Sequence, residues 1–243
     1  MDHHPTTTAG PAAWAVPAVA AATALTVLLL PAAAWLAGRL PGRPLGQLLA
    51  LLLPLHAGGL LTVLAVLGRQ SPARSWPAAL GLAWPPAEAG GGWTLFRRTA
   101  LRLAWVYPLA AVLAATGATI GTLLGHPPAA NPLLALVGSG SGPLFWLAVP
   151  LLLGVLVPLA EEILFRVVLH DALAAWLPAA AAAGLTALLF AALHGSLVQA
   201  PSLFLLGVVL QRLRNRAGSL WPALGLHMGV NLTALVLLPW LPA

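Results

Sequence analysis

Long apolar segments without any charge are the feature that most constrains this chain. No charged residue occurs from Pro11 to Gly38 or from Leu144 to Ala160. Of the 243 residues, 60% are hydrophobic and 7% are charged, whereas a soluble domain carries about 25% charged residues. Inside a bilayer every backbone polar group must be satisfied by the chain itself, and apolar helices achieve this. The sequence therefore predicts an all-α protein, a polytopic bundle of transmembrane helices.

The apolar runs divide into about seven expected spans, within a range of about six to eight. They cover residues 14–35, 45–67, 101–124, 143–176, 178–197, 201–213 and 220–240. Trp14 and Trp35 would lie about 31 Å apart along a helix, which suits one tryptophan at each side of a hydrocarbon core of about 30 Å. The fourth run would be about 50 Å long as one helix, so we expect it to be tilted, kinked or partly outside the membrane.

We expect one membrane domain with two unequal parts after a short polar N-terminus at residues 1–13. Residues 14–142 form an N-terminal transmembrane region. Within it, residues 68–98 are rich in Arg, Trp and Pro and suit a surface loop at the membrane interface, with a plain linker as the alternative. A loop rich in Gly and Pro, residues 125–142, follows the third span. Residues 143–243 form the second part, which carries the polar residues described below.

The basic residues define the expected orientation in the membrane. The net charge of +6 comes from 11 arginines, since the chain has no lysine. They cluster between apolar runs, so they are topology signals, and no nucleic-acid partner is expected. The loop 68–98 and the cluster from Arg212 to Arg216 are separated by an even number of expected spans. Both can therefore be cytoplasmic, which places the N-terminus inside, while Arg39 and Arg43 fall on the opposite side.

Two adjacent acids and an arginine interrupt the fourth run. Glu161 and Glu162 are two of the five acidic residues, and Arg166 follows Glu162 at the i+4 position. Residues four apart share a helix face, so Glu162 and Arg166 are expected to form a structural ion pair. Glu161 points about 100° away and is left without this partner. An ionisable residue at membrane depth is costly and marks a functional site by default.

Two later spans carry polar residues at the same helical spacing. Phe190 and His194 are four apart near the end of the fifth run, and His227 and Asn231 are four apart in the last run. Each polar residue has a simple alternative explanation, since a histidine can bond a carbonyl and an asparagine can join two helices. Their joint occurrence with Glu161 in an otherwise apolar half of the chain favours a common site.

This set of residues suits hydrolysis of an amide bond, which needs a base for water, a proton for the leaving amine and donors for the oxyanion. Glu161 can act as the base, and His194 can hold the water and shuttle a proton. His227 and Asn231 can donate to the oxyanion. No hydroxyl nucleophile has an evident paired base, and the absence of cysteine excludes thiolate chemistry and Cys-ligated metals. Direct attack by an activated water is therefore expected.

The three motifs, in this order, resemble the CAAX protease and bacteriocin-processing (CPBP, or Abi) family. They stand as Glu161-Glu162-x-x-x-Arg166, Phe190-x-x-x-His194 and His227-x-x-x-Asn231. The segment 218–223 is also similar to bacterial members. The resemblance covers the C-terminal part of the chain, so residues 143–243 are expected to be the catalytic membrane core, with Glu162, Arg166 and Phe190 supporting the site.

The resemblance implies an intramembrane endopeptidase. In the family, the first Glu and the His of the second motif activate water, and the final His and Asn form the oxyanion hole. These roles fall on Glu161 with His194 and on His227 with Asn231. The implied partner is a membrane-embedded or lipid-linked peptide in the lipid bilayer; the eukaryotic branch removes the residues that follow a prenylated cysteine. Bacterial members act in bacteriocin maturation and self-immunity, so the expected location is a bacterial plasma membrane.

A metal is the open question in the expected mechanism. The family is often labelled metalloprotease, and Glu161, His194 and His227 could bind Zn²⁺ with an open position. The chain contains no HExxH motif, and a mechanism without a cofactor is favoured. His56, in the second run, is interpreted as a packed or lumen-facing histidine rather than as a ligand.

The competing class of function is a non-enzyme. Glu161 and the histidines could relay protons in a coupled transporter, and an inactive protease site could serve as a bacteriocin self-immunity scaffold. Transporters often contain inverted repeats with paired broken helices. The candidate polar residues of this chain all lie in its second half and show no such repeat. The protease is therefore the favoured hypothesis.

Overall fold

A computed structural model describes residues 15–70, 75–84, 91–125 and 132–237. The predicted polar N-terminus at residues 1–13, Trp14 and the last residues of the predicted span 220–240 lie outside the described residues. The described parts of the chain contain helices and no strand, which confirms the all-α prediction.

The helices follow one another in long runs. Their bounds are α1 (Ala15–Gly38), α2 (Pro44–Leu52), η1 (Leu53–Ala57), α3 (Gly58–Gln70), α4 (Trp76–Ala79), α5 (Gly91–Leu123), α6 (Pro132–Gly138), α7 (Pro143–Leu151), η4 (Leu152–Leu156), α8 (Val157–Glu161), η5 (Glu162–Leu169), α9 (His170–Ala174), α10 (Ala179–Leu193), α11 (Ala200–Ala217) and α12 (Trp221–Leu237). Elements η1, η4 and η5 are π-helical turns that continue the flanking α-helices. The segments α2–α3 and α7–α9 are therefore each one helical run.

Four helices within the described residues are long and apolar enough to cross a membrane. They are Ala15–Gly38, Pro44–Arg69, Phe96–Leu123 and Pro143–Ala174, and α10 and α12 are shorter apolar helices. The fourth of these is the expected long motif helix, which is continuous through two π-helical turns. Helices of this length and composition match the thickness of a bilayer, so the chain is an integral membrane protein.

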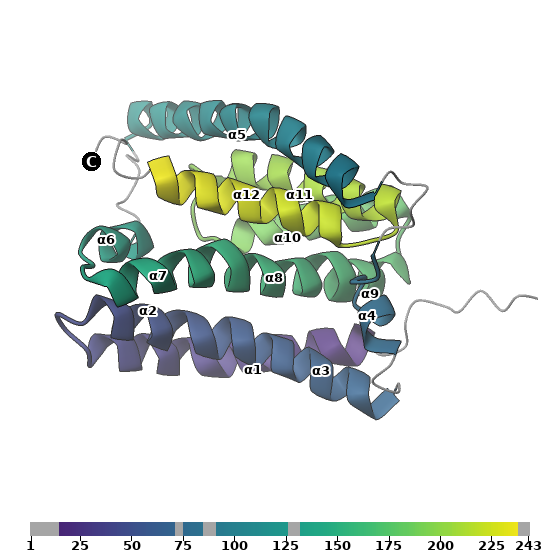
Figure 1. Cartoon of the computed structure of the whole chain (residues 1–243), viewed down its shortest axis with the longest axis horizontal. Coiled ribbons are helices and arrows are strands. Elements are labelled where there is room, and N and C mark those ends of the chain that lie inside the picture. Colours follow the sequence, from purple (N-terminus) through teal and green to yellow (C-terminus); the bar gives the residue numbers. More distant parts are fainter. Residues whose placement is uncertain (1–14, 71–74, 85–90, 126–131, 238–243) are drawn as a thin grey trace, which may run out of the picture.

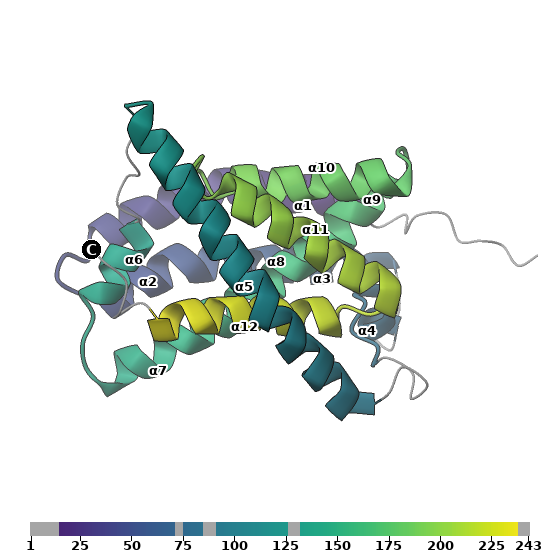
Figure 2. The same ribbon diagram turned by 90° about the horizontal axis from the view of Figure 1, so that it is seen from above.

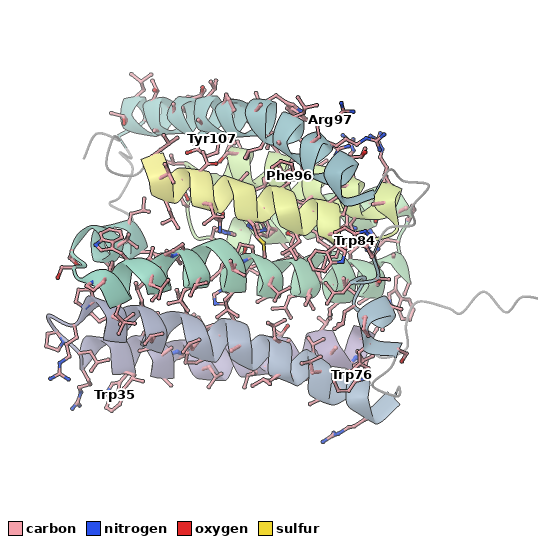
Figure 3. All side chains as sticks on the ribbon, viewed as in Figure 1. Trp35, Trp76, Trp84, Phe96, Arg97 and Tyr107 are labelled. Carbon is pink, nitrogen blue, oxygen red and sulfur yellow. The ribbon has the colours of Figure 1, made fainter. Side chains whose placement is uncertain are left out.

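Two segments expected as loops contain helix. Within 68–98, α3 continues to Gln70, α4 forms one turn, and α5 begins at Gly91 rather than near Leu101. The expected loop at 125–142 contains α6. Helix α5 includes Arg97 and Arg98 near its start. Long arginine side chains can extend toward the membrane interface while the helical backbone stays hydrogen-bonded, so these charges are compatible with a helix. Figure 3 shows Arg97 on the outward side of α5.

The motif helix lies in the middle of the bundle. Figure 1 shows the run α7–α9 between one layer formed by α1 with α2–α3 and another formed by α10, α11 and α12. Helix α5 lies outside the second layer and crosses α11 and α12 diagonally, as Figure 2 shows from above. Both layers contact the motif helix around Glu161, since η1 packs against α8 from one side and α12 from the other.

Close packing of α10 against α11 depends on a glycine. A Cβ atom at Gly207 would lie 3.0 Å from both the Cα and the Cβ atoms of Ala187 on α10. Small residues at helix interfaces in membranes allow backbones to approach in this way.

We expect Gly207→Val to lower the free energy of unfolding by about 1–3 kcal/mol, the usual cost of overpacking, because the backbone of α10 must move. Gly184→Ala on α10 is the matched control. A Cβ at Gly184 would meet no atom within 4 Å, and alanine favours a helix over glycine, so stability should be unchanged or higher. Thermal unfolding in detergent measures both variants, and equal stability of the two would contradict this packing.

Candidate functional site

Phe190 is the centre of the polar cluster. It is fully buried on α10, and its ring centroid lies 4.7 Å from that of His194 and 5.8 Å from that of His227. The Arg166 guanidinium lies 4.8 Å from the centroid of the same ring, and Phe165 packs edge-on against it at 5.2 Å. One aromatic ring thus joins residues from α10, α12 and η5.

Glu162 and Arg166 form a fully buried ion pair on η5. The Nε atom of Arg166 lies 3.4 Å from Oε2 of Glu162, and neither side chain is accessible to solvent. No hydrogen-bond acceptor for the guanidinium is found among the described residues, so the charge of Glu162 and the face of Phe190 compensate it. The Oε1 atom of Glu162 accepts a hydrogen bond of 2.9 Å from Nδ1 of His227. Glu162 therefore also orients His227.

Glu161 lies between two histidines. Its Oε2 atom is 3.5 Å from Nε2 of His227, and its Oε1 atom is 3.9 Å from Nε2 of His56. The side chain keeps 16% of its accessible surface, whereas that of Glu162 keeps none. A protonated His194 would also act electrostatically on this carboxylate. The acid without an i+4 partner thus faces histidines from two other elements, η1 and α12.

His194 follows the last residue of α10 as its cap. Its Nδ1 atom donates a hydrogen bond of 2.7 Å to the carbonyl oxygen of Phe190, because a carbonyl can only accept. This bond leaves Nε2 available for another partner, and the side chain is exposed. Gly195 follows in a left-handed conformation with φ of +68°, which turns the chain away from the helix end. His194 therefore lies at the end of the helix rather than within it.

Asn231 bonds the backbone of η4. Its Nδ2 atom donates a hydrogen bond of 2.8 Å to the carbonyl oxygen of Leu153. In the π-helical turn each carbonyl accepts from the N–H five residues later, as Leu152 does from Val157. By this pattern the carbonyl of Leu153 would need the N–H of residue 158. Residue 158 is a proline and has no N–H. Asn231 supplies the missing donor and joins α12 to the motif helix.

The segment that carries these residues also matches a known family. Residues 143–233 match the family described as Type II CAAX prenyl endopeptidase Rce1-like. This segment is an Rce1-like domain. The match confirms the resemblance to the CPBP (Abi) family that the three motifs predicted, and membership in this family implies a protease. No curated protein and no solved structure matches the chain.

The Rce1-like domain brings most of the predicted residues into one cluster. Direct contacts join Glu161, Glu162 and His227, while Phe190 links His194 to them. Asn231 follows His227 by one turn of α12, and its side-chain amide bonds the backbone of η4.

Sequence reasoning missed one residue, His56, which lies outside the Rce1-like domain. The only signal available was an ionisable side chain within an apolar run. The positions of His56 and Glu161 in the sequence do not predict that they are close, because their proximity depends on how η1 packs against α8.

The described residues contain no group of three or more His, Asp or Glu side chains placed to hold a metal ion. The donors of the zinc alternative are Glu161, His194 and His227. Nε2 of His227 and Oε2 of Glu161 lie 3.5 Å apart, a separation that suits two ligands of one tetrahedral Zn²⁺ with bonds of about 2.0–2.2 Å. Within the described residues, His194 does not join this pair to form a group of three, so a zinc site of these ligands would require His194 to move.

We expect Glu162→Gln to destabilise the Rce1-like domain by about 3–5 kcal/mol, because it leaves the buried Arg166 cation without its counter-charge. Arg166→Met should cost a similar amount, since it leaves the Glu162 carboxylate unpaired. The double variant removes both charges and should recover much of the loss, as replacing a whole buried pair is often close to neutral. Thermal unfolding of the four proteins forms a double-mutant cycle, and additive losses would show that the charges do not stabilise each other.

Proposed function

We propose that this protein is an intramembrane endopeptidase that hydrolyses a peptide bond with a water molecule activated by Glu161. The observation that carries the proposal is the Glu161 carboxylate beside Nε2 of His227, within an Rce1-like domain. The domain is part of an apolar helical bundle, so the cleaved bond lies in or at the membrane. The substrates of the family are prenylated, CAAX-type proteins, which supports a membrane-embedded or lipid-linked peptide as substrate.

The first step is attack by water on the scissile carbonyl carbon. Glu161 accepts one proton of the water as the new carbon–oxygen bond forms. Nε2 of His194 holds the same water, since Nδ1 of that ring already donates to the backbone of α10. Collapse of the tetrahedral intermediate then breaks the carbon–nitrogen bond. The proton taken by Glu161 passes to the leaving amine, directly or through His194.

His227 and Asn231 stabilise the oxyanion of the intermediate. Because Nδ1 of His227 donates to Glu162, donation to the oxyanion requires a second proton on Nε2. The amide of Asn231 has two N–H groups, and the one that is not used by Leu153 is available for the oxyanion. Both side chains lie one turn apart on α12, so their donors are placed before the reaction begins.

The arrangement of helices also supports an orientation in a bacterial plasma membrane, crossed by α1, α2–α3, α5, α7–α9, α10, α11 and α12. The start of α1, the end of α3, the start of α5 and the end of α11 lie at one end of the bundle in Figure 1. These ends carry Arg69, Arg97, Arg98 and the arginines from Arg212 to Arg216. By the positive-inside rule this end faces the cytoplasm, with the N-terminus inside.

The base is tested by Glu161→Gln, which keeps the size of the side chain and removes its charge. We expect turnover of a prenylated CAAX-type peptide in proteoliposomes to fall by at least about 100-fold, since a general base contributes about 10²–10⁴-fold. Binding of the peptide should persist. The matched control is Asp171→Asn, because Asp171 lies on the same helical run but pairs with Arg214, away from the site.

A chelator tests the metal alternative in the same assay. Wild-type turnover in its presence is the expected result, whereas loss of turnover that added Zn²⁺ restores would support a metalloprotease. Solute flux without peptide cleavage would contradict the protease altogether.

Asn231 is expected to have two separable roles. Asn231→Ala should lower stability by about 1–3 kcal/mol, because the Leu153 carbonyl loses its donor. Turnover per folded molecule should fall by about 10²–10³-fold through loss of an oxyanion donor. Adding Pro158→Ala restores a backbone N–H for Leu153, so the double variant should regain stability but not turnover. Unchanged turnover per folded molecule in Asn231→Ala would mean that Asn231 only joins the helices.

A further inference from the structure

His56 belongs to the N-terminal region, yet it reaches the candidate base of the Rce1-like domain. Its Nε2 atom lies 3.9 Å from Oε1 of Glu161, while His227 faces the other oxygen, Oε2. The side chains of His56 and Glu161 keep 17% and 16% of their accessible surface. Both oxygens of this carboxylate therefore face an imidazole, and the two imidazoles come from opposite layers of the bundle.

The local backbone determines which nitrogen of His56 faces Glu161. His56 lies in the π-helical turn η1, which contains Pro54. Its Nδ1 atom lies 3.0 Å from the carbonyl oxygen of Leu52, and it must be the donor because a carbonyl can only accept. This bond fixes the ring, so that Nε2 is the atom left for Glu161.

Two glycines next to His56 allow its helix to approach the rest of the site. A Cβ atom at Gly59 would lie 3.3 Å from Cδ1 of Leu164 on η5. A Cβ atom at Gly58 would lie 3.4 Å from the side chains of Leu25 and Leu29 on α1. Side chains larger than alanine at these two positions would have to displace the leucine side chains or the helical run itself. The helical run that carries His56 is therefore in contact with both η5 and α1.

The separation of 3.9 Å identifies the kind of interaction. It is longer than a direct hydrogen bond, so the two groups attract each other electrostatically or through one bridging water. An imidazole nitrogen and a carboxylate oxygen attract only when a proton or a water lies between them. His56 thus restrains Oε1 of Glu161 on the side opposite His227.

We propose that His56 is a positioning residue, which keeps the Glu161 carboxylate in the orientation from which it activates water. This inference rests on the proposed endopeptidase function and adds that the N-terminal region completes the site. A general base must lie within hydrogen-bond reach of the proton that it removes, and a misplacement of about 1 Å can cost about 100-fold in rate.

Two amide variants separate positioning from a structural role. In His56→Gln the amide nitrogen lies near the place of Nε2 and can donate toward Glu161. In His56→Asn it reaches only the place of Nδ1, so the bond to Leu52 can form while contact with Glu161 is lost. We expect His56→Gln to retain most of the turnover. His56→Asn should lower kcat by about 10–100-fold with little change in KM.

The measurement is kcat and KM for a prenylated CAAX-type peptide in proteoliposomes, normalised to folded protein, with thermal unfolding of each variant. A purely structural role through Leu52 predicts the opposite order, with His56→Asn active and His56→Gln impaired. The positioning role is overturned if wild type cleaves the peptide and His56→Asn retains its turnover, or if His56→Gln falls as far as His56→Asn. If wild type itself cleaves nothing while correctly folded, the endopeptidase function fails first.

Discussion

The buried charges of Glu162 and Arg166 are the constraint on which the site depends. Neither side chain reaches solvent, so each must be compensated within the bundle. Glu162 accepts from His227 on α12, and Arg166 lies over the ring of Phe190 on α10. The ion pair therefore cannot form correctly unless α10 and α12 are both in place. The contacts that compensate these two charges therefore help to determine how the motif helix packs against α10 and α12.

Two adjacent glutamates have different surroundings because of helix geometry. About 100° separates neighbouring residues on a helix, so Glu162 points toward Arg166, while Glu161 faces His56 and His227 and keeps 16% of its accessible surface. A fully buried, paired carboxylate has a structural role, whereas a carboxylate that water can reach is able to exchange a proton with it. This difference is the structural basis for proposing Glu161, and not Glu162, as the base.

Three features of the candidate site involve π-helical turns. His56 is in η1, Asn231 bonds a carbonyl of η4, and η5 begins at Glu162. Such π-helical turns are frequent at functional sites, since they leave backbone groups to be bonded by side chains. Pro158 has this effect on the Leu153 carbonyl. The side chain that supplies the bond is then held in a fixed place, which suits a residue that must act on a substrate.

The sequence by itself determined the features that depend on local geometry. Uncharged runs predicted apolar helices, and the i, i+4 spacing placed Glu162 with Arg166 and Phe190 with His194. Only the tertiary structure decided that His56 faces Glu161, that Asn231 bonds the backbone of η4, and that α5 begins at Gly91. The reason is physical. Spacing along a helix is set by 3.6 residues per turn, which the sequence states directly. In a bilayer, however, nearly every helix face is apolar, so hydropathy does not say which faces meet, and close packing of small residues decides it.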